Sequence, residues 1–134
     1  MGDRVSPQGN EDTGSDKVQG APLTVHALNV LTGLPATGLV MQCSQLGGFD
    51  APWTELMQSS TDSDGRLNLV SENFPRLVAA TYKVRFETGA YWQQQGYTSF
   101  YPYVEVVFTV TEAEQKVHIP LLLSPYSYTT YRGS

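Results

Sequence analysis

The sequence predicts an all-β protein, an antiparallel sandwich of two sheets with about eight short strands and one short helix. Apolar and polar residues alternate in short runs along the chain, which is the period of a strand with one buried face. Glycine, proline and aspartate recur between these runs, at positions where tight turns require them. Only residues 88–95 lack this alternation and carry the possible caps of a short helix.

The first half of the domain is expected to contain four strands, at residues 23–30, 39–46, 53–60 and 66–70. Residues 55–58 also have good helix propensity, so a helix is the alternative for the third segment. Residues 32–35 are expected to form a turn, and Gly47-Gly48 ends the second strand. The pair Asp64-Gly65 marks a tight turn before the fourth strand.

The second half is expected to contain four more strands, at residues 79–87, 103–110, 117–124 and 126–131. The helix at 88–95 lies between the first two, with Thr88 as its N-cap and Gly96 as its C-cap. Pro125 separates the last two strands, because proline has no N–H with which to continue a ladder. The last strand is rich in tyrosine and threonine, so we expect it to be docked on the protein.

The 134 residues are expected to form one domain, at 22–134, behind a disordered N-terminal tail at 1–21. Residues 1–20 are rich in glycine, serine, aspartate and glutamate, and have few apolar side chains. Such a segment cannot bury enough surface to offset the entropy lost on ordering. We therefore leave it out of the predicted fold.

Composition excludes several classes of function. The net charge is −5 and the basic residues are scattered, which argues against a nucleic-acid binder. The single cysteine, Cys43, excludes an internal disulfide, and no set of residues has the spacing of a zinc site, so no metal or cofactor is expected. No apolar run approaches the roughly 20 residues of a membrane span. Residues 1–20 lack the apolar region of a signal peptide, which favours an intracellular protein.

The two histidines, His26 and His118, are the first candidates for chemistry. His118 lies on the face of its strand opposite to the apolar residues, so the ordinary explanation is a surface histidine. The same explanation applies to His26, since a lone histidine in a strand is more often structural than catalytic. If the two imidazoles converge, one of them could act as a neutral general base near pH 7.

Two arginines are further candidates. Arg66 follows a turn, where a solvated side chain is the default, whereas Arg132 lies among the aromatic residues of the last strand. Two fixed guanidinium groups could hold a planar anion or polarise a carbonyl through paired N–H donors. Asp62 and Asp64 faintly resemble a calcium loop, but the distal glutamate is missing and turn chemistry explains them better.

The chain resembles the 5-hydroxyisourate hydrolases, which are transthyretin-like enzymes of urate breakdown. It ends in Tyr131-Arg132-Gly133-Ser134, which looks like the signature tetrapeptide of that family. Four other segments match in the family's order: 23–26, 64–66, 100–108 and 118–125. The resemblance covers roughly residues 22–134. The sequence of residues 68–78 departs from the pattern that is usual in the family. This departure concerns the loop and not the site.

The resemblance implies a two-sheet transthyretin-like sandwich that assembles as a homotetramer, a dimer of dimers, around a central channel. It also implies that His26, Arg66 and His118 are catalytic, and that His26 and Arg66 bind substrate together with Tyr131, Arg132, Gly133 and Ser134. The reaction implied is hydrolysis of 5-hydroxyisourate to 2-oxo-4-hydroxy-4-carboxy-5-ureidoimidazoline, in the peroxisome or cytoplasm. Which histidine would be the base stays open.

The main alternative is a transthyretin-type carrier that binds thyroid hormone in the same channel. Transthyretins resemble this fold closely, but they lack the Tyr-Arg-Gly-Ser ending and the paired histidines, and they are secreted. A sandwich used only for protein interaction would give no reason for His26, Arg66 and His118 to converge. The hydrolase interpretation is therefore favoured.

Overall fold

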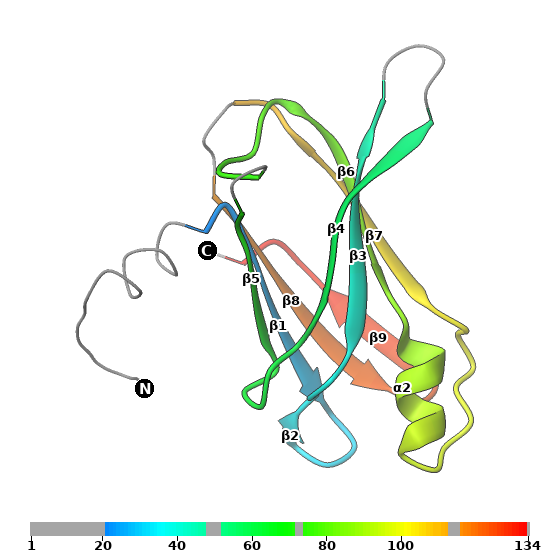
Figure 1. Cartoon of the computed structure of the whole chain (residues 1–134). Coiled ribbons are helices and arrows are strands. Elements are labelled where there is room, and N and C mark those ends of the chain that lie inside the picture. Colours follow the sequence, from blue (N-terminus) through cyan, green and yellow to red (C-terminus); the bar gives the residue numbers. More distant parts are fainter. Residues whose placement is uncertain (1–20, 48–51, 72–73, 113–115, 134) are drawn as a thin grey trace, which may run out of the picture.

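A computed structural model of the chain describes residues 21–47, 52–71, 74–112 and 116–133, which form two β-sheets packed face to face (Figure 1). Apart from Ala21, the predicted tail lies outside the described residues, and Ala21 itself is buried. The two-sheet all-β fold predicted from the sequence is confirmed.

The first sheet has the strand order β2-β1-β8-β9, with β5 paired to β1 on the same side as β2. Its strands are β1 (Leu23–Asn29), β2 (Leu34–Pro35), β5 (Arg66–Leu69), β8 (Val117–Ser124) and β9 (Ser127–Thr130). β2 falls within the segment predicted as a turn, because its two residues pair with the end of β1. The described part of the chain therefore contains one strand more than the eight expected.

The second sheet has the order β4-β3-β6-β7 and is antiparallel throughout. Its strands are β3 (Val40–Leu46), β4 (Trp53–Ser60), β6 (Ala80–Phe86) and β7 (Val104–Val110). The alternative of a helix at residues 55–58 is wrong, since all four lie in β4 and pair with β3. The core lies between the sheets and contains Trp92, Tyr82 and Phe86 as its largest fully buried side chains.

One strand pair departs from the predicted antiparallel arrangement. β1 and β8 run parallel over their whole length, from Leu23 against Val117 to Asn29 against Leu123. Antiparallel pairing is imposed only on strands joined by a short hairpin. Almost the whole domain separates β1 from β8, so the chain is free to bring β8 back in either direction.

The helix α2 (Thr88–Gln94) is confirmed, but its predicted N-cap is wrong. Glu87 occupies the N-cap position without a side-chain cap hydrogen bond, and Thr88 is the first helical residue, buried against the core. The predicted C-cap is also wrong by one residue: Gln95 is the C-cap, and Gly96 follows it with a φ of +88°, a left-handed conformation that glycine adopts freely. Within the described ranges, no helix is long and apolar enough to cross a membrane.

Candidate active site

The outer face of the first sheet brings three of the candidate residues to adjacent strands. In β1 and β8 the odd-numbered residues face the core, so the even-numbered ones, including His26 and His118, lie on the outer face. Arg66 is the register partner of His26 across β5 and β1, and His118 lies on β8 at the other side of β1. The two histidines and the arginine therefore converge, as the catalytic interpretation of the sequence requires.

A tight turn places Arg66 at the first position of β5. The Asp62 carboxylate accepts the backbone N–H groups of Asp64 and Arg66, both at 2.9 Å, and Asp62 thereby acts as a turn residue. Gly65 has a φ of +74°, and a Cβ at this position would collide with the carbonyl oxygen of Ala27. The predicted Asp-Gly turn is confirmed, and it fixes Arg66 beside His26.

The imidazole of His118 is held by its neighbours on two sides. Thr24 Oγ1 lies 2.7 Å from His118 Nδ1. Gly133 donates its backbone N–H to the His118 carbonyl at 2.8 Å, and a Cβ on Gly133 would come within 2.5 Å of His118 Cδ2. The segment after β9 (Figure 1) thus returns to β8, where Gly133 forms a backbone bridge with His118.

A pocket of about 470 Å³ opens beside these residues. Its walls include Arg66 and His118, the backbone of Gly133, and the polar side chains Thr24 and Asn68. The volume lies within the range of sites for small organic molecules. His26 does not line this pocket, but it lies close enough to Arg66 and His118 to interact with both electrostatically.

The surroundings lower the pKa of both histidines. For His118 the causes, in order, are burial, the nearby His26 and the positive charge of Arg66. For His26 they are burial and Arg66, and a hydrogen bond to the Asp64 backbone and the charges of Asp62 and Asp64 raise the pKa in part. Burial and a neighbouring cation both disfavour the protonated ring. Both imidazoles are therefore neutral at pH 7 and available as proton acceptors.

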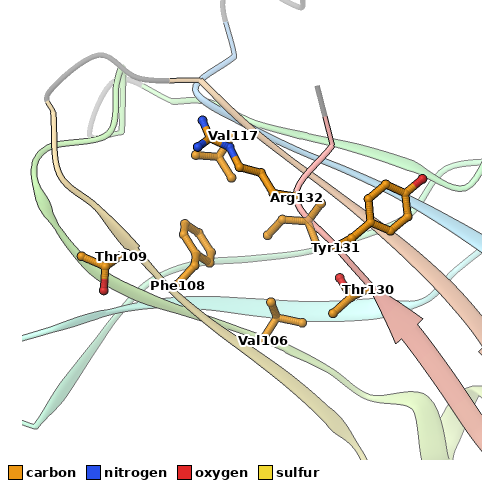
Figure 2. Close-up of a pocket in the computed structure, with 8 residues that line it drawn as sticks. Val106, Phe108, Thr109, Val117, Thr130, Tyr131 and Arg132 are labelled. Atoms are coloured by element: carbon orange, nitrogen blue, oxygen red, sulfur yellow. The ribbon is translucent and has the colours of Figure 1, made fainter.

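Tyr131 and Arg132 lie at a different pocket, of about 220 Å³, on the core side of the first sheet. Its other walls are mainly apolar and come from β7 and β8, including Val106, Phe108 and Val117. Figure 2 shows Arg132 extending toward Val117, whereas the ring of Tyr131 points away from Phe108. Of the terminal tetrapeptide, Gly133 alone among the described residues lines the histidine pocket, and Ser134 lies outside the described residues.

Cys43 takes no part in this site. Its side chain is fully buried in the core, and burial raises the pKa of the thiol to about 12, so it is an inert core residue. In the described part of the chain, no group of three or more histidine, cysteine, aspartate or glutamate side chains is placed to hold a metal ion.

Sequence reasoning did not single out Thr24, Asn68 and Lys116, which also line the histidine pocket. Thr24 had a usable signal, since it precedes His26 by two residues and shares its face of the strand. Asn68 stands in the same relation to Arg66 on β5. Their closeness to His118 had no local signal, because it depends on the parallel pairing of β1 with β8.

The chain is similar to known proteins over nearly all of its described residues. Residues 23–133 match the model of the HIUase/Transthyretin family. The 5-hydroxyisourate hydrolase of Mus musculus is 50% identical over 117 residues, which cover 87% of this chain and 98% of the mouse protein. The probable 5-hydroxyisourate hydrolase of Schizosaccharomyces pombe is 42% identical over 117 residues, which cover 87% of this chain and 94% of the yeast protein.

Solved structures of both branches of the family share the fold. Transthyretin from Sparus aurata superposes with a TM-score of 0.77 at 38% identity, covering 84% of this chain and 97% of that chain. The 5-hydroxyisourate hydrolase of Klebsiella pneumoniae has a TM-score of 0.72 at 30% identity, covering 84% of this chain and 92% of that chain. With the family model matched from the first strand to the terminal segment, the chain belongs to the HIUase/transthyretin family.

Proposed function

We propose that this chain is a 5-hydroxyisourate hydrolase, which opens the six-membered ring of 5-hydroxyisourate during urate degradation. The observation that carries the proposal is the convergence of Arg66 with two neutral histidines on the outer face of the first sheet. The names of relatives that are 40–50% identical over most of the chain support the same activity. The product is 2-oxo-4-hydroxy-4-carboxy-5-ureidoimidazoline.

In the proposed mechanism, one neutral histidine takes a proton from water as the water oxygen attacks the ring carbonyl. His118 is the better candidate for this base, because it lines the pocket and its ring is held by Thr24 and Gly133. His26 orients the water before the attack, or it relays the proton from His118 to the ring nitrogen as the C–N bond breaks. The carbonyl carbon ends as a carboxylate, and the proton from water ends on the released nitrogen.

Arg66 is proposed to stabilise the negative charge that develops on the carbonyl oxygen. Its guanidinium offers N–H donors in a fixed plane, and it lines the same pocket as His118. The same charge lowers the pKa of both histidines and so keeps them ready to accept a proton. Tyr131, Arg132 and Ser134 are proposed to help bind the substrate, as the resemblance of the terminal tetrapeptide implies. Since Tyr131 and Arg132 line the separate 220 Å³ pocket of the single chain, this role requires a neighbouring subunit of the homotetramer proposed below to bring them to the histidine pocket.

The test is direct. Urate oxidase generates 5-hydroxyisourate from urate in the cuvette, and its ultraviolet decay is followed with and without this protein. We expect 5-hydroxyisourate to decay faster than it does spontaneously, with an added rate proportional to the protein concentration. A well-folded preparation that leaves the decay rate unchanged would remove the hydrolase proposal.

The competing function is that of a hormone carrier, since one neighbouring structure is sea bream transthyretin in complex with thyroxine. The hydrolase is favoured here because the chain carries His26, His118 and the terminal tetrapeptide, which transthyretins lack. A thyroxine titration beside the decay assay separates the two. Tight thyroxine binding without any acceleration of decay would favour the carrier.

We further propose that the chain works as a homotetramer. The outer face of the first sheet carries the half-buried apolar side chains of Leu28, Pro120 and Leu122 next to the histidines. The edge strands β7 and β9 border the 220 Å³ pocket together, and open edges are templates for pairing with another chain. Light scattering coupled to size exclusion should give a mass four times that of the chain, and a monomer would contradict the proposal.

We place the activity in the peroxisome or the cytosol, because the family that the chain resembles works in those compartments in eukaryotes. Imaging of an N-terminal fluorescent fusion beside a peroxisomal marker decides between them.

The activity should depend on pH through the two histidines. Because their pKa values are lowered, the neutral, proton-accepting forms persist below the ordinary histidine pKa of about 6.5. The rate should therefore be constant above neutrality and fall in acid, with the midpoint of the kcat/KM profile below pH 6.5. NMR titration of the two imidazoles measures the same quantities independently, and a midpoint above 7 would contradict this electrostatic account.

Substituting Gly133 should disturb the site without touching a charged group. A Cβ in Gly133→Ala meets the ring of His118, so the imidazole must rotate or the terminal segment must move. We expect kcat to fall by up to about 10²-fold, the cost of displacing a reacting group by about 1 Å. Gly38→Ala is the matched control, because a Cβ there meets nothing within 4 Å, although its φ of +75° makes a small loss of stability expected. Unchanged kcat in Gly133→Ala would mean that the terminal segment does not position His118.

A further inference from the structure

The hydrogen bond between Thr24 and His118 joins two strands that are distant in the sequence. Thr24 Oγ1 and His118 Nδ1 are 2.7 Å apart, a short distance for a contact of this kind, and the pair is partly buried. The two residues are direct register partners of the parallel β1–β8 ladder. The register of the sheet therefore places their side chains next to each other on the same face.

The contacts around His118 leave one edge of its ring open. Nδ1 faces Thr24, and Gly133 packs against Cδ2. In imidazole the remaining edge consists of Cε1 and Nε2. Since His118 and Thr24 both line the 470 Å³ pocket, Nε2 is the ring nitrogen left to meet a ligand there.

We propose that Thr24 is a positioning residue for the reaction: its Oγ1 accepts the Nδ1–H of neutral His118, which leaves the lone pair on Nε2 as the proton acceptor. This deepens the proposed hydrolase function and rests on it. A hydroxyl oxygen can accept this bond and still donate its own hydrogen elsewhere. The hydrogen bond made by one nitrogen of a histidine decides which state the other presents.

The charges around the ring favour this direction of the bond. Arg66 and Lys116 line the pocket, and His26 lies on the neighbouring strand between Arg66 and His118. A positive charge on the pocket side stabilises a lone pair that points toward it and opposes an N–H there. The tautomer with its proton on Nδ1 donates a hydrogen bond to Thr24 and also turns the Nε2 lone pair toward these positive charges. The tautomer with its proton on Nε2, which free histidine prefers, would satisfy only Thr24.

The test compares Thr24→Val with Thr24→Ser. Valine keeps the branched shape of threonine and removes the hydroxyl, whereas serine restores it. We expect Thr24→Val to lower kcat by about 10–100-fold, as loss of a partner that orients a functional histidine does elsewhere, with KM changed much less, and Thr24→Ser to recover most of the rate. The ¹⁵N spectrum of His118 should show the Nδ1–H tautomer in the wild type and in Thr24→Ser, and a shift toward Nε2–H in Thr24→Val.

Thr81→Val is the matched control, because Thr81 makes a comparable hydroxyl contact, 2.8 Å to Thr109, on the outer face of the other sheet. It should leave both kcat and the His118 spectrum unchanged. An Nε2–H tautomer in the wild type would overturn the proposal, as would a Thr24→Val variant that loses activity with an unchanged His118 spectrum. If the wild type does not accelerate 5-hydroxyisourate decay, the hydrolase function fails, while the spectrum still decides which tautomer Thr24 holds.

Discussion

Replacing His118 with asparagine is expected to lower kcat for 5-hydroxyisourate by about 10²–10⁴-fold, the usual contribution of a general base. The amide of asparagine overlaps the Nδ1 position of the imidazole, so it can keep a hydrogen bond to Thr24. What the variant loses is the Nε2 atom that faces the pocket. The experiment therefore removes the proton acceptor while the β1–β8 contact is conserved.

The fold should survive this substitution. His118 lies on the outer face of the sheet, where its neighbours Val117 and Ile119 supply the core contacts of the strand. We expect an unchanged circular dichroism spectrum and the same oligomeric state. The decay assay on the purified variant then gives kcat and KM, and the acid limb of its kcat/KM profile should lose the titration of the base.

His26→Asn under the same conditions assigns the second histidine. If His118 is the base, His26→Asn should retain more activity and keep the acid limb, because His26 does not line the pocket and acts on the water or on the leaving nitrogen. Near-full activity in His118→Asn combined with a large loss in His26→Asn would reverse the two roles. Loss of activity in neither variant would contradict histidine catalysis at this site.

Local sequence patterns predicted the strands and their buried faces well, and the reason is physical. The period of two in β1 and β8 fixes which side chains face the core, so His26 and His118 could be placed on the outer face from sequence. The Asp64-Gly65 turn was also readable, because few residues other than glycine adopt its positive φ. These features depend on neighbours within a few residues, and a single sequence carries that information.

The features that sequence could not provide depend on contacts between distant segments. The alternation of apolar and polar residues shows which face of a strand is buried, but not which strands lie beside it. The parallel β1–β8 pairing and the Thr24–His118 contact therefore had no local signal in the sequence. The terminal segment shows the same limit. Its motif predicted one site for Tyr131, Arg132 and Gly133, but only the sheet register determines that Gly133 meets His118 while Arg132 faces the core side.

Replacing Arg66 with glutamine is expected to lower kcat by about 10²–10³-fold, the usual effect of removing one donor from an oxyanion site. Arg66 begins β5 and is exposed on the outer face, so its side chain supports no core packing. Arg66→Lys separates charge from geometry, because lysine keeps the positive charge but loses the planar array of donors. If stabilisation of the oxyanion needs that array, lysine should restore only a small part of the rate.

Arg66→Gln should also change the pKa values of the two histidines. The charge of Arg66 lowers the pKa of His26 and His118, so its removal in Arg66→Gln should raise both values and move the acid limb of kcat/KM to higher pH. Arg66→Lys should leave the acid limb near its wild-type position. A change that merely disturbed the fold would not shift a titration in one variant and spare it in the other. Arg85→Gln is the matched control, since Arg85 pairs with Glu87 on the outer face of the second sheet and should affect neither kcat nor the acid limb.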